Sequence, residues 1–304
     1  MKIAPIILFV YCRPYHTQKT IEALKANYLA SQSDLYIFSD GPKDIKVSES
    51  VNRVREYIHA IDGFRSVKIK ERTGNLGLAN SIIAGVSEVI SLHGSVIVLE
   101  DDLVSSPNFL DFANQSLEKY ESEKKIFSIA GYTYNLQFPP LYDYGNYFSP
   151  RCESLGWGTW IDRWQKADWN IADFKNFLSN KDDQKTFSHG GEDLVDMLKK
   201  QLEGKIDSWA VRWCYAHFRN EAYCSYPVIS KIIHIGTDKY ATHVKFRKRF
   251  LDTKLDSGEQ REFNLSAKIL VEGYIQIQYQ RIFRSNLLKK IKKQLLALLN
   301  LYKI

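Results

Sequence analysis

The 304-residue chain has only four cysteines and no long apolar run. Cys12, Cys152, Cys214 and Cys224 show no Cys-x-x-Cys spacing and no accompanying histidine pattern, so a structural zinc site is not expected. They are typical of reduced thiols in a cytosolic chain. No stretch approaches the roughly 20 apolar residues that a membrane-spanning helix needs. The apolar segment 3–11 is short, runs directly into Arg13 and Pro14 and lacks a small-residue cleavage site, so it is expected to be a first strand and not an export signal.

The charge excess of the chain is confined to its C-terminal tail. The formal net charge is +7, and segment 281–304 carries seven basic residues and no acidic ones. A globally basic surface of the nucleic-acid-binding kind is therefore not indicated, and no nucleic acid partner is expected. The content of 44% hydrophobic and 25% charged residues fits one large domain or two closely joined ones. The chain has no internal repeat and no low-complexity linker.

Strand-like and helix-like segments alternate in the first third of the chain. The strand-like runs are 6–11, 35–39, 67–70 and 96–99, and the helix-like runs between them are 17–29, 50–61 and 78–92. This alternation is typical of βαβ units. It predicts the α/β class, with a Rossmann-like, mostly parallel sheet flanked by helices on both faces. We expect 1–125 to form one half of the fold, 126–256 a second half, and 257–304 a helical C-terminal extension.

Polar residues follow each of the four predicted strands. In open α/β sheets the carboxyl ends of parallel strands meet at one edge, where ligands bind. Four polar strand ends are therefore expected to converge there, and their residues are Arg13, Asp40, Arg72 with Asn75, and the triplet Glu100, Asp101 and Asp102.

The acidic triplet is the most informative of these strand ends. Three adjacent carboxylates repel one another unless a cation lies among them. Hard divalent cations such as Mg²⁺ or Mn²⁺ bind carboxylate oxygens together with substrate phosphates, so the triplet favours a metal-bound nucleoside diphosphate or triphosphate. The alternative is a solvated acidic turn after a strand.

Pattern is weaker after residue 125. Runs 126–134 and 147–151 are expected to be strands, 155–160 a glycine-hinged aromatic loop, 208–220 a helix with Asp207 as its N-cap, 226–235 a strand and 236–256 a mobile basic loop. Trp157 and Trp160 would either form an apolar platform for a sugar or fill the core. Gly156 and Gly158 favour exposure of this loop.

With these residues in place, the chain resembles a GT-A fold glycosyltransferase, a bacterial relative of the animal N-acetylglucosaminyltransferase I group. The likeness covers about 6–236. It depends on the segments 9–13, 39–40, 75–79, 100–102, 155–157 and 207–209. Only the acidic triplet in its ordered surroundings is quite specific.

The resemblance implies roles for individual residues. Asp102 would be the main protein ligand to Mn²⁺ (or Mg²⁺), and Asp207 would be the catalytic base that takes the proton of the acceptor hydroxyl. The animal family has paired aspartates where this chain has Asp207-Ser208, which leaves the register open by one residue, and Glu192 and Asp193 are reserve candidates. The expected donor-binding residues are Phe9, Tyr11, Arg13, Asp40, Arg72, Asn75, Glu100 and Asp101, and the expected acceptor-binding residues are Gly156, Trp157 and Trp209.

The function that follows is a metal-dependent, inverting transfer of a sugar from a UDP-sugar to a hydroxyl of a surface glycan or a lipid-linked acceptor. N-acetylglucosamine is the leading donor sugar by resemblance, and capsule, O-antigen or lipooligosaccharide assembly is the expected setting. A nucleotidylyltransferase is the first alternative, but it would carry a glycine-rich loop after the first strand, and segment 10–15 contains no glycine. A non-catalytic glycan- or lipid-binding protein is the second alternative.

The C-terminal tail predicts an amphipathic helix with a cationic shoulder. Between 287 and 301 apolar residues alternate with Lys289, Lys290, Lys292 and Lys293; the apolar residues include Leu287, Leu288, Ile291, Leu295, Leu296, Leu298 and Leu299. Such a helix suits the surface of an anionic membrane, where each basic residue contributes about 1 kcal/mol. We therefore expect a cytoplasmic protein held peripherally on the inner face of the plasma membrane. A helix that docks on protein is the alternative.

Truncation tests the tail. The full chain is expected to co-sediment with anionic liposomes and not with neutral ones, and a version that ends at Arg284 is expected to lose this binding, because the basic helix supplies the attraction. Equal binding of both versions to anionic liposomes would rule the tail out as the anchor.

Overall fold

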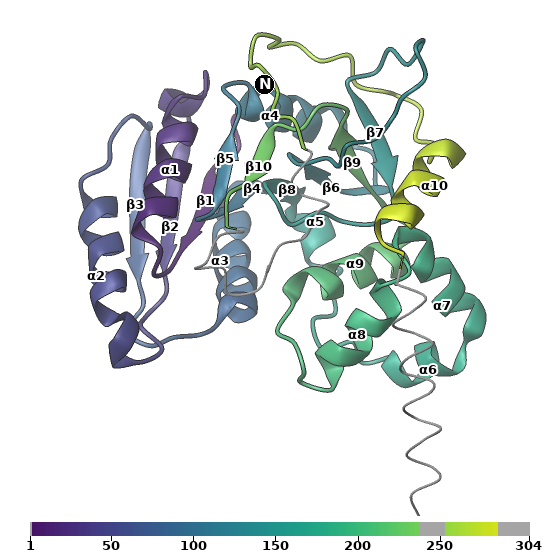
Figure 1. The fold of residues 1–304 in the computed structure, drawn as a ribbon, viewed down its shortest axis with the longest axis horizontal. Coiled ribbons are helices and arrows are strands. Elements are labelled where there is room, and N and C mark those ends of the chain that lie inside the picture. The colour runs from purple at the N-terminus through teal and green to yellow at the C-terminus, as the bar shows by residue number, and fades with distance from the viewer. Residues whose placement is uncertain (1, 237–252, 285–304) are drawn as a thin grey trace, which may run out of the picture.

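A computed structural model describes residues 2–236 and 253–284 (Figure 1). Their main feature is an eight-stranded sheet in the order β3-β2-β1-β4-β8-β6-β9-β7. The first four strands of this order are parallel, as are β6 and β9, while β8 and β7 run antiparallel to their neighbours. The predicted class, an α/β fold with a large, mostly parallel sheet flanked by helices, is confirmed.

The parallel part of the sheet follows the alternation seen in the sequence. Its strands are β1 (Ile6–Val10), β2 (Asp34–Ser39), β3 (Ser66–Glu71) and β4 (Ser95–Glu100), and its connecting helices are α1 (Pro14–Lys25), α2 (Ile45–His59) and α3 (Leu78–His93). Since β1 lies between β2 and β4, its carboxyl end is at the centre of this edge.

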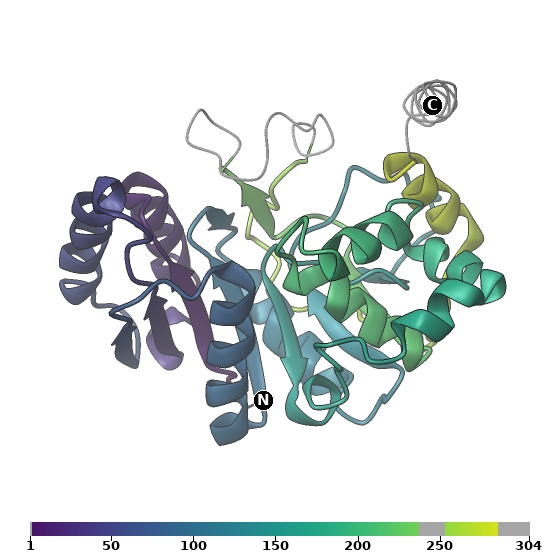
Figure 2. The same cartoon turned by 90° about the horizontal axis from the view of Figure 1, so that it is seen from below.

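Side-chain alternation along the strands divides the core into two layers. Ile6 and Leu8 of β1 pack on one face with α1, α2 and α4 (Phe109–Lys119), whereas Ile7 and Phe9 pack on the other face with α3 and α9 (Trp209–Arg219). This is the period of two that a strand buried on both sides requires. Figure 2 shows α1 and α2 on the left, α3 in the middle and the later helices on the right.

Most of the expected aromatic loop at 155–160, namely 157–160, is in fact a strand. β8 (Trp157–Trp160) pairs with β4 on one side and with β6 (Ile126–Ala130) on the other. A Cβ atom on Gly158 would lie 2.9 Å from the Val96 carbonyl oxygen, so glycine is needed here for close packing between strands and not for a hinge. The prediction of a loop was wrong because the signal of the two glycines is the same in both cases.

The segment predicted as one strand at 226–235 forms two. β9 (Tyr223–Pro227) lies in the main sheet beside β7 (Asn146–Ser149), whereas β10 (Ile232–His234) pairs with β5 (Leu103–Ser105). This second pairing brings 232–236 to the end of β4. Residues 253–284 are attached next to β10 by a buried ion pair between Lys231 and Asp256, with 2.5 Å between Nζ and Oδ2.

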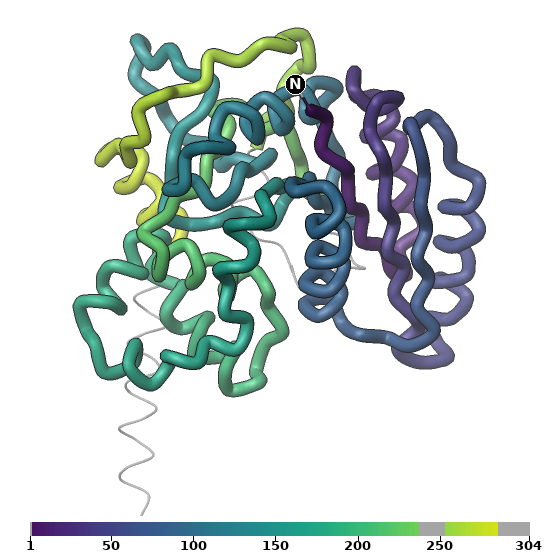
Figure 3. Tube along the Cα trace, turned by 180° about the vertical axis from the view of Figure 1, so that it is seen from behind, coloured from purple at the N-terminus to yellow at the C-terminus, as the bar shows by residue number. Residues whose placement is uncertain are grey.

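A helical group covers the second half of the sheet, and five tryptophans pack inside it. The remaining helices are α5 (Ile161–Trp164), α6 (Phe174–Ser179), α7 (Lys181–Phe187), α8 (Leu194–Leu202) and α10 (Gly273–Ile282). The rings of Trp157, Trp164, Trp169, Trp209 and Trp213 contact one another at centroid distances of 4.5 to 6.4 Å. Figure 3 shows from behind that the first and second halves of the chain occupy opposite sides of the molecule.

Two expectations fall on residues that are not described. They are the C-terminal amphipathic helix within 285–304 and most of the basic loop expected at 236–256. Among the described residues, no helix combines the length and the apolar character that a membrane crossing requires.

Candidate functional site

The candidate site begins at the carboxyl ends of β1 and β4, where Arg13 meets the acidic triplet. Arg13 Nη2 lies 2.5 Å from Asp101 Oδ1, and its Nη1 lies 2.9 Å from Asp102 Oδ2. Asp101 also accepts a hydrogen bond from the Tyr11 amide at 3.2 Å. Arg13 stands directly before α1, so the loop between β1 and α1 places the guanidinium beside β4.

Burial and charge give the three carboxyls different protonation behaviour. Burial raises the pKa of Glu100, and the charges of Asp102 and Asp101 raise it further. Burial also opposes ionisation of Asp102, but hydrogen bonds and charge from His234 and Arg13 outweigh it and hold the pKa of Asp102 well below its usual range. Of the two carboxyls, Asp102 is therefore the one whose ionised form the surroundings favour.

His234 is a site residue that the sequence did not reveal. Its Nε2 lies 3.1 Å from Asp102 Oδ2, and the side chain is largely buried at the end of β10. A Cβ on Gly236 would clash with Asp102 Oδ2 and lie 2.9 Å from Arg13 Nη1, so a larger residue there would displace the Asp102 carboxylate or the Arg13 guanidinium. The signal was a histidine at the end of an apolar run, followed two residues later by glycine, which is too common a pattern to single out.

The residues present fit a divalent metal bound together with a ligand. Asp102 and His234 supply a carboxylate oxygen and an imidazole nitrogen, both of which Mn²⁺ accepts. Within 2–236 and 253–284 no group of three or more His, Cys, Asp or Glu residues is arranged to hold a metal. A cation here would therefore need further oxygen ligands from a phosphate or from water, which is the usual arrangement beside nucleotides.

The carboxyl ends of the parallel strands and the loops that follow them form one edge of the sheet, called the rim below. The loops after β2 and β3 form the next part of this rim. Asp40 is buried, and its Oδ2 accepts hydrogen bonds from the amides of Leu76 and Gly77, each at 3.1 Å. Asn75 Nδ2 donates to the Gly41 carbonyl at 2.8 Å. Asp40 and Asn75 are therefore brought together, as predicted from their positions at neighbouring strand ends.

Three further residues of the predicted donor group differ in position. Tyr11 joins the two parts of the rim, because its amide donates to Asp101 while its hydroxyl accepts from the Lys43 amide at 3.0 Å. The Arg72 guanidinium turns toward α3, where it donates to the Ser81 hydroxyl. Phe9 is buried and stacks on Phe38 with 5.4 Å between ring centroids, so it belongs to the core and not to the rim.

Asp207 lies at the first turn of α3, close to the loop that Asp40 holds. Its Oδ2 accepts from the Ala79 amide at 3.4 Å. The prediction that Asp207 caps α9 is wrong, since Ser208 is the N-cap and its hydroxyl accepts from the Val211 amide at 3.3 Å. The exposed Asp207 carboxylate is therefore directed to α3, and two aspartates distant in sequence meet at one helix N-terminus.

The predicted acceptor residues Gly156, Trp157 and Trp209 are buried. Trp157 is 1% exposed and stacks on Trp209 with 4.8 Å between ring centroids. Trp160 is buried too, and its indole N–H donates to the Leu117 carbonyl. Rings with no accessible face cannot pack on a sugar, so core filling, the other interpretation of this segment, agrees with the structure.

The reserve candidates for the base lie at the start of α8. Asp193 forms a two-point ion pair with Arg151, at 2.8 Å and 3.2 Å, and Arg151 also packs 3.7 Å from the Phe283 ring centroid. An aspartate committed to a buried arginine is poorly suited to accept protons during turnover. Glu192 Oε1 lies 4.0 Å from Arg284 Nε.

Comparison of sequences shows a likeness to glycosyltransferases. The chain is 26% identical over 244 residues to an alpha-1,3-mannosyl-glycoprotein 2-beta-N-acetylglucosaminyltransferase of Arabidopsis thaliana. The match covers 70% of this chain and 53% of the relative, so the chain spans about half the length of the curated relative that it matches. The resemblance to the N-acetylglucosaminyltransferase I group is thereby confirmed. No model of a protein family matches the chain.

Two solved structures that match the chain share little sequence with it. A Pyrobaculum calidifontis mannosyltransferase, in complex with GDP-Man and Mn²⁺, is 9% identical, with a TM-score of 0.38 over 55% of this chain and 48% of its own. TarS 1–349 of S. aureus is 8% identical, with a TM-score of 0.41 over 76% of this chain and 60% of its own.

The ion pair of Asp193 gives a test of its role. Asp193→Asn is expected to lower the free energy of unfolding by about 3 kcal/mol, because it leaves the buried Arg151 without its counter-charge. Urea unfolding followed by circular dichroism measures this. Glu192→Gln, one residue away, is the matched control and should change stability by less than about 0.5 kcal/mol. An Asp193→Asn variant with unchanged stability would return Asp193 to the candidates for the base.

Proposed function

We propose that this chain is a metal-dependent, inverting glycosyltransferase that uses a UDP-sugar, with N-acetylglucosamine as the leading donor sugar. The observation that carries the proposal is the position of Asp102, held between Arg13 and His234 at the carboxyl end of the parallel sheet. The acceptor would be a hydroxyl of a bacterial surface glycan or a lipid-linked oligosaccharide. The likeness to the plant N-acetylglucosaminyltransferase supports the reaction class.

The donor would bind across the strand ends. Asp102 and His234 would hold Mn²⁺ or Mg²⁺ with the diphosphate oxygens, and Arg13 keeps Asp102 ionised and correctly oriented. When bound, the metal would neutralise charge that develops on the departing diphosphate. Glu100 and Asp101 remain proposed contacts of the ribose and donor sugar. Tyr11, Asp40 and Asn75 lie on the side where the nucleoside would be held.

Asp207 is the proposed base. It is exposed to solvent, as a group that meets an incoming acceptor must be, and it adjoins the 76–79 segment that Asp40 positions. Its carboxylate would take the proton from the acceptor hydroxyl as that oxygen attacks the anomeric carbon on the side opposite the diphosphate. Transfer in this geometry inverts the configuration of the sugar.

The cellular setting follows from the sequence of the tail. The proposed location is the inner face of the plasma membrane, with the basic segment 285–304 on anionic lipid. Capsule or lipopolysaccharide assembly would place lipid-linked acceptors at the same surface.

The metal assignment predicts the behaviour of Asp102→Asn. Loss of the anionic ligand is expected to abolish transfer and Mn²⁺-dependent UDP binding while the fold is kept, because Arg13 retains its pair with Asp101. His234→Gln should lower the affinity for Mn²⁺ by more than roughly 10- to 100-fold, which is the loss expected when a partner outside the metal's own ligands is removed. UDP release and calorimetric UDP titration with and without Mn²⁺ measure both. Asp62→Asn, in an exposed ion pair, is the control. Full activity of Asp102→Asn at limiting Mn²⁺ would contradict the assignment.

The base assignment predicts that Asp207→Asn keeps UDP-sugar affinity and loses at least about 10²-fold in transfer rate. The asparagine oxygen can still accept from the Ala79 amide, so the local structure is expected to persist. Ser208→Ala tests which of the two neighbouring residues, 207 or 208, acts as the base. Loss of the Ser208 N-cap is expected to cost about 1 kcal/mol of stability without a comparable loss of rate. If donor affinity collapses in Asp207→Asn while the maximal rate survives, Asp207 belongs to the donor site and Glu192 becomes the candidate.

A further inference from the structure

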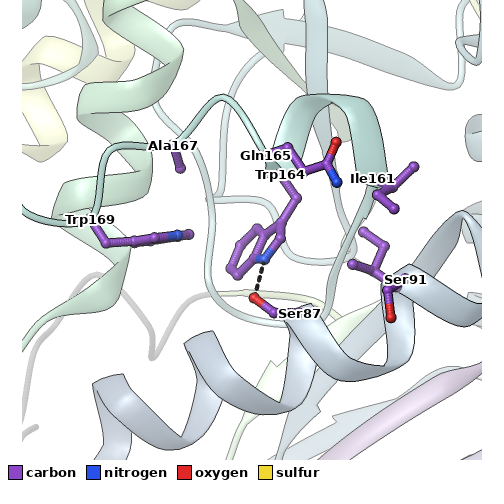
Figure 4. Close-up of a pocket in the computed structure, with 8 residues that line it drawn as sticks. Ser87, Ser91, Ile161, Trp164, Gln165, Ala167 and Trp169 are labelled. Carbon is purple, nitrogen blue, oxygen red and sulfur yellow. Dashed lines mark hydrogen bonds between the residues drawn. The ribbon is translucent and has the colours of Figure 1, made fainter.

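A cavity lies between the C-terminal half of α3 and the α5 region, away from the strand ends. Its volume is about 270 Å³, and it is lined by Ser87, Ile90, Ser91, Ile161, Trp164, Gln165, Ala167 and Trp169. Figure 4 shows the Trp164 ring between the Trp169 ring and α3, with its indole N–H donating to the Ser87 hydroxyl at 2.9 Å.

The lining has the chemistry of a site for an uncharged, hydroxyl-rich ring. None of the eight lining residues is charged, so a phosphate, a nucleotide or a carboxylate would find no counter-charge. The half-buried Trp169 offers aromatic surface for the CH-rich face of a sugar, and the buried Trp164 ring lies behind it with 4.5 Å between ring centroids. Ser87, Ser91 and Gln165 offer hydroxyl and amide groups. The volume is just below the lower limit of about 300 Å³ for pockets that enclose drug-sized ligands, so it suits one or two rings.

The position of the cavity along α3 relates it to the candidate base. Asp207 contacts the amide of Ala79 in the first turn, and Ser87 and Ser91 lie eight and twelve residues further on. At about 1.5 Å per residue, the cavity is about 12–18 Å along the helix from that contact. This separation is too large for the reacting sugar and suits a neighbouring part of the same glycan.

On the α9 side, Arg212 connects the cavity with the segment around Asp207. Its Nη1 donates to the Trp169 carbonyl at 3.1 Å and its Nε donates to the Ser208 carbonyl at 3.3 Å. The residue that follows Asp207 and an aromatic wall of the cavity are therefore fixed to the same guanidinium.

The geometry points to a sugar-binding subsite that holds one pyranose ring of the acceptor glycan at a distance from its reacting hydroxyl. This inference deepens the proposed function and rests on it for the identity of the glycan as acceptor. The subsite would favour acceptors of several sugar residues over single sugars.

Indole resonances of the ¹⁵N-tryptophan-labelled full chain give a direct test. The probes are glucose, galactose, mannose and N-acetylglucosamine, as free sugars and as linear trisaccharides. At least one is expected to shift the Trp164 and Trp169 signals saturably, in the millimolar range. If none of these sugars moves either signal, the inference is overturned.

A matched pair of variants tests the location. Ser91→Trp fills the cavity from an exposed helix position and is expected to abolish the shifts, whereas Leu92→Trp adds the same side chain at the neighbouring exposed position and should leave them unchanged. Thermal unfolding of both variants checks that the fold persists. Shifts that survive in Ser91→Trp would place the sugar elsewhere and overturn the inference.

Titration of the same samples with UDP and Mn²⁺ separates this inference from the proposed function. UDP binding is expected to be equal in the wild type and both variants, because the donor site lies at the strand ends. Sugar binding without UDP binding would refute the donor assignment and keep the cavity as a sugar site. UDP binding without sugar binding would refute the cavity alone.

Discussion

The ion pairs of Arg13 with Asp101 and Asp102 are the interaction on which the rest of the site depends. Two unit charges 4 Å apart interact by about 4 kcal/mol at an effective dielectric constant of 20, so three carboxylates at a buried sheet edge would oppose folding if all were ionised and unpaired. The guanidinium offsets this repulsion through its two ion pairs, and the raised pKa of Glu100 reduces it further. Because Arg13 directly precedes α1, the position of this helix also fixes the position of the positive charge in the site.

Helix α3 provides the second organising constraint. Its N-terminus receives Asp40 from the end of β2 and Asp207 from the start of α9, so the loops that would hold a nucleotide and the group that would act on an acceptor share one set of backbone amides. Carboxylates are favoured at this end of a helix by its dipole. The C-terminal half of the same helix forms a wall of the aromatic cavity. A rigid helix thus fixes the spacing between the two places.

The aromatic residues illustrate where sequence reasoning fails. Trp157 and Trp209 stand beside glycine and acid, which is typical of sugar sites, yet both rings are buried in a cluster that joins β8 to α9. Trp169, which no local motif singled out, is the half-buried ring that lines a cavity. Composition identifies tryptophan as useful for both purposes. Only the packing of neighbouring elements decides which face of a ring remains accessible.

The sequence by itself determined the parallel half of the sheet, the order of its helices and the convergence of Asp40, Asn75 and the acidic triplet, because βαβ connections force the carboxyl ends of successive strands to one edge. The tertiary structure decided what local patterns could not: that 157–160 is a central strand, that Ser208 and not Asp207 caps α9, and that His234 reaches Asp102 across 132 residues of sequence. The spacing of apolar residues within a segment shows which face of that helix or strand is buried. The partner of a strand, and the side chain that a distant loop delivers, depend on contacts between segments that carry no local signal.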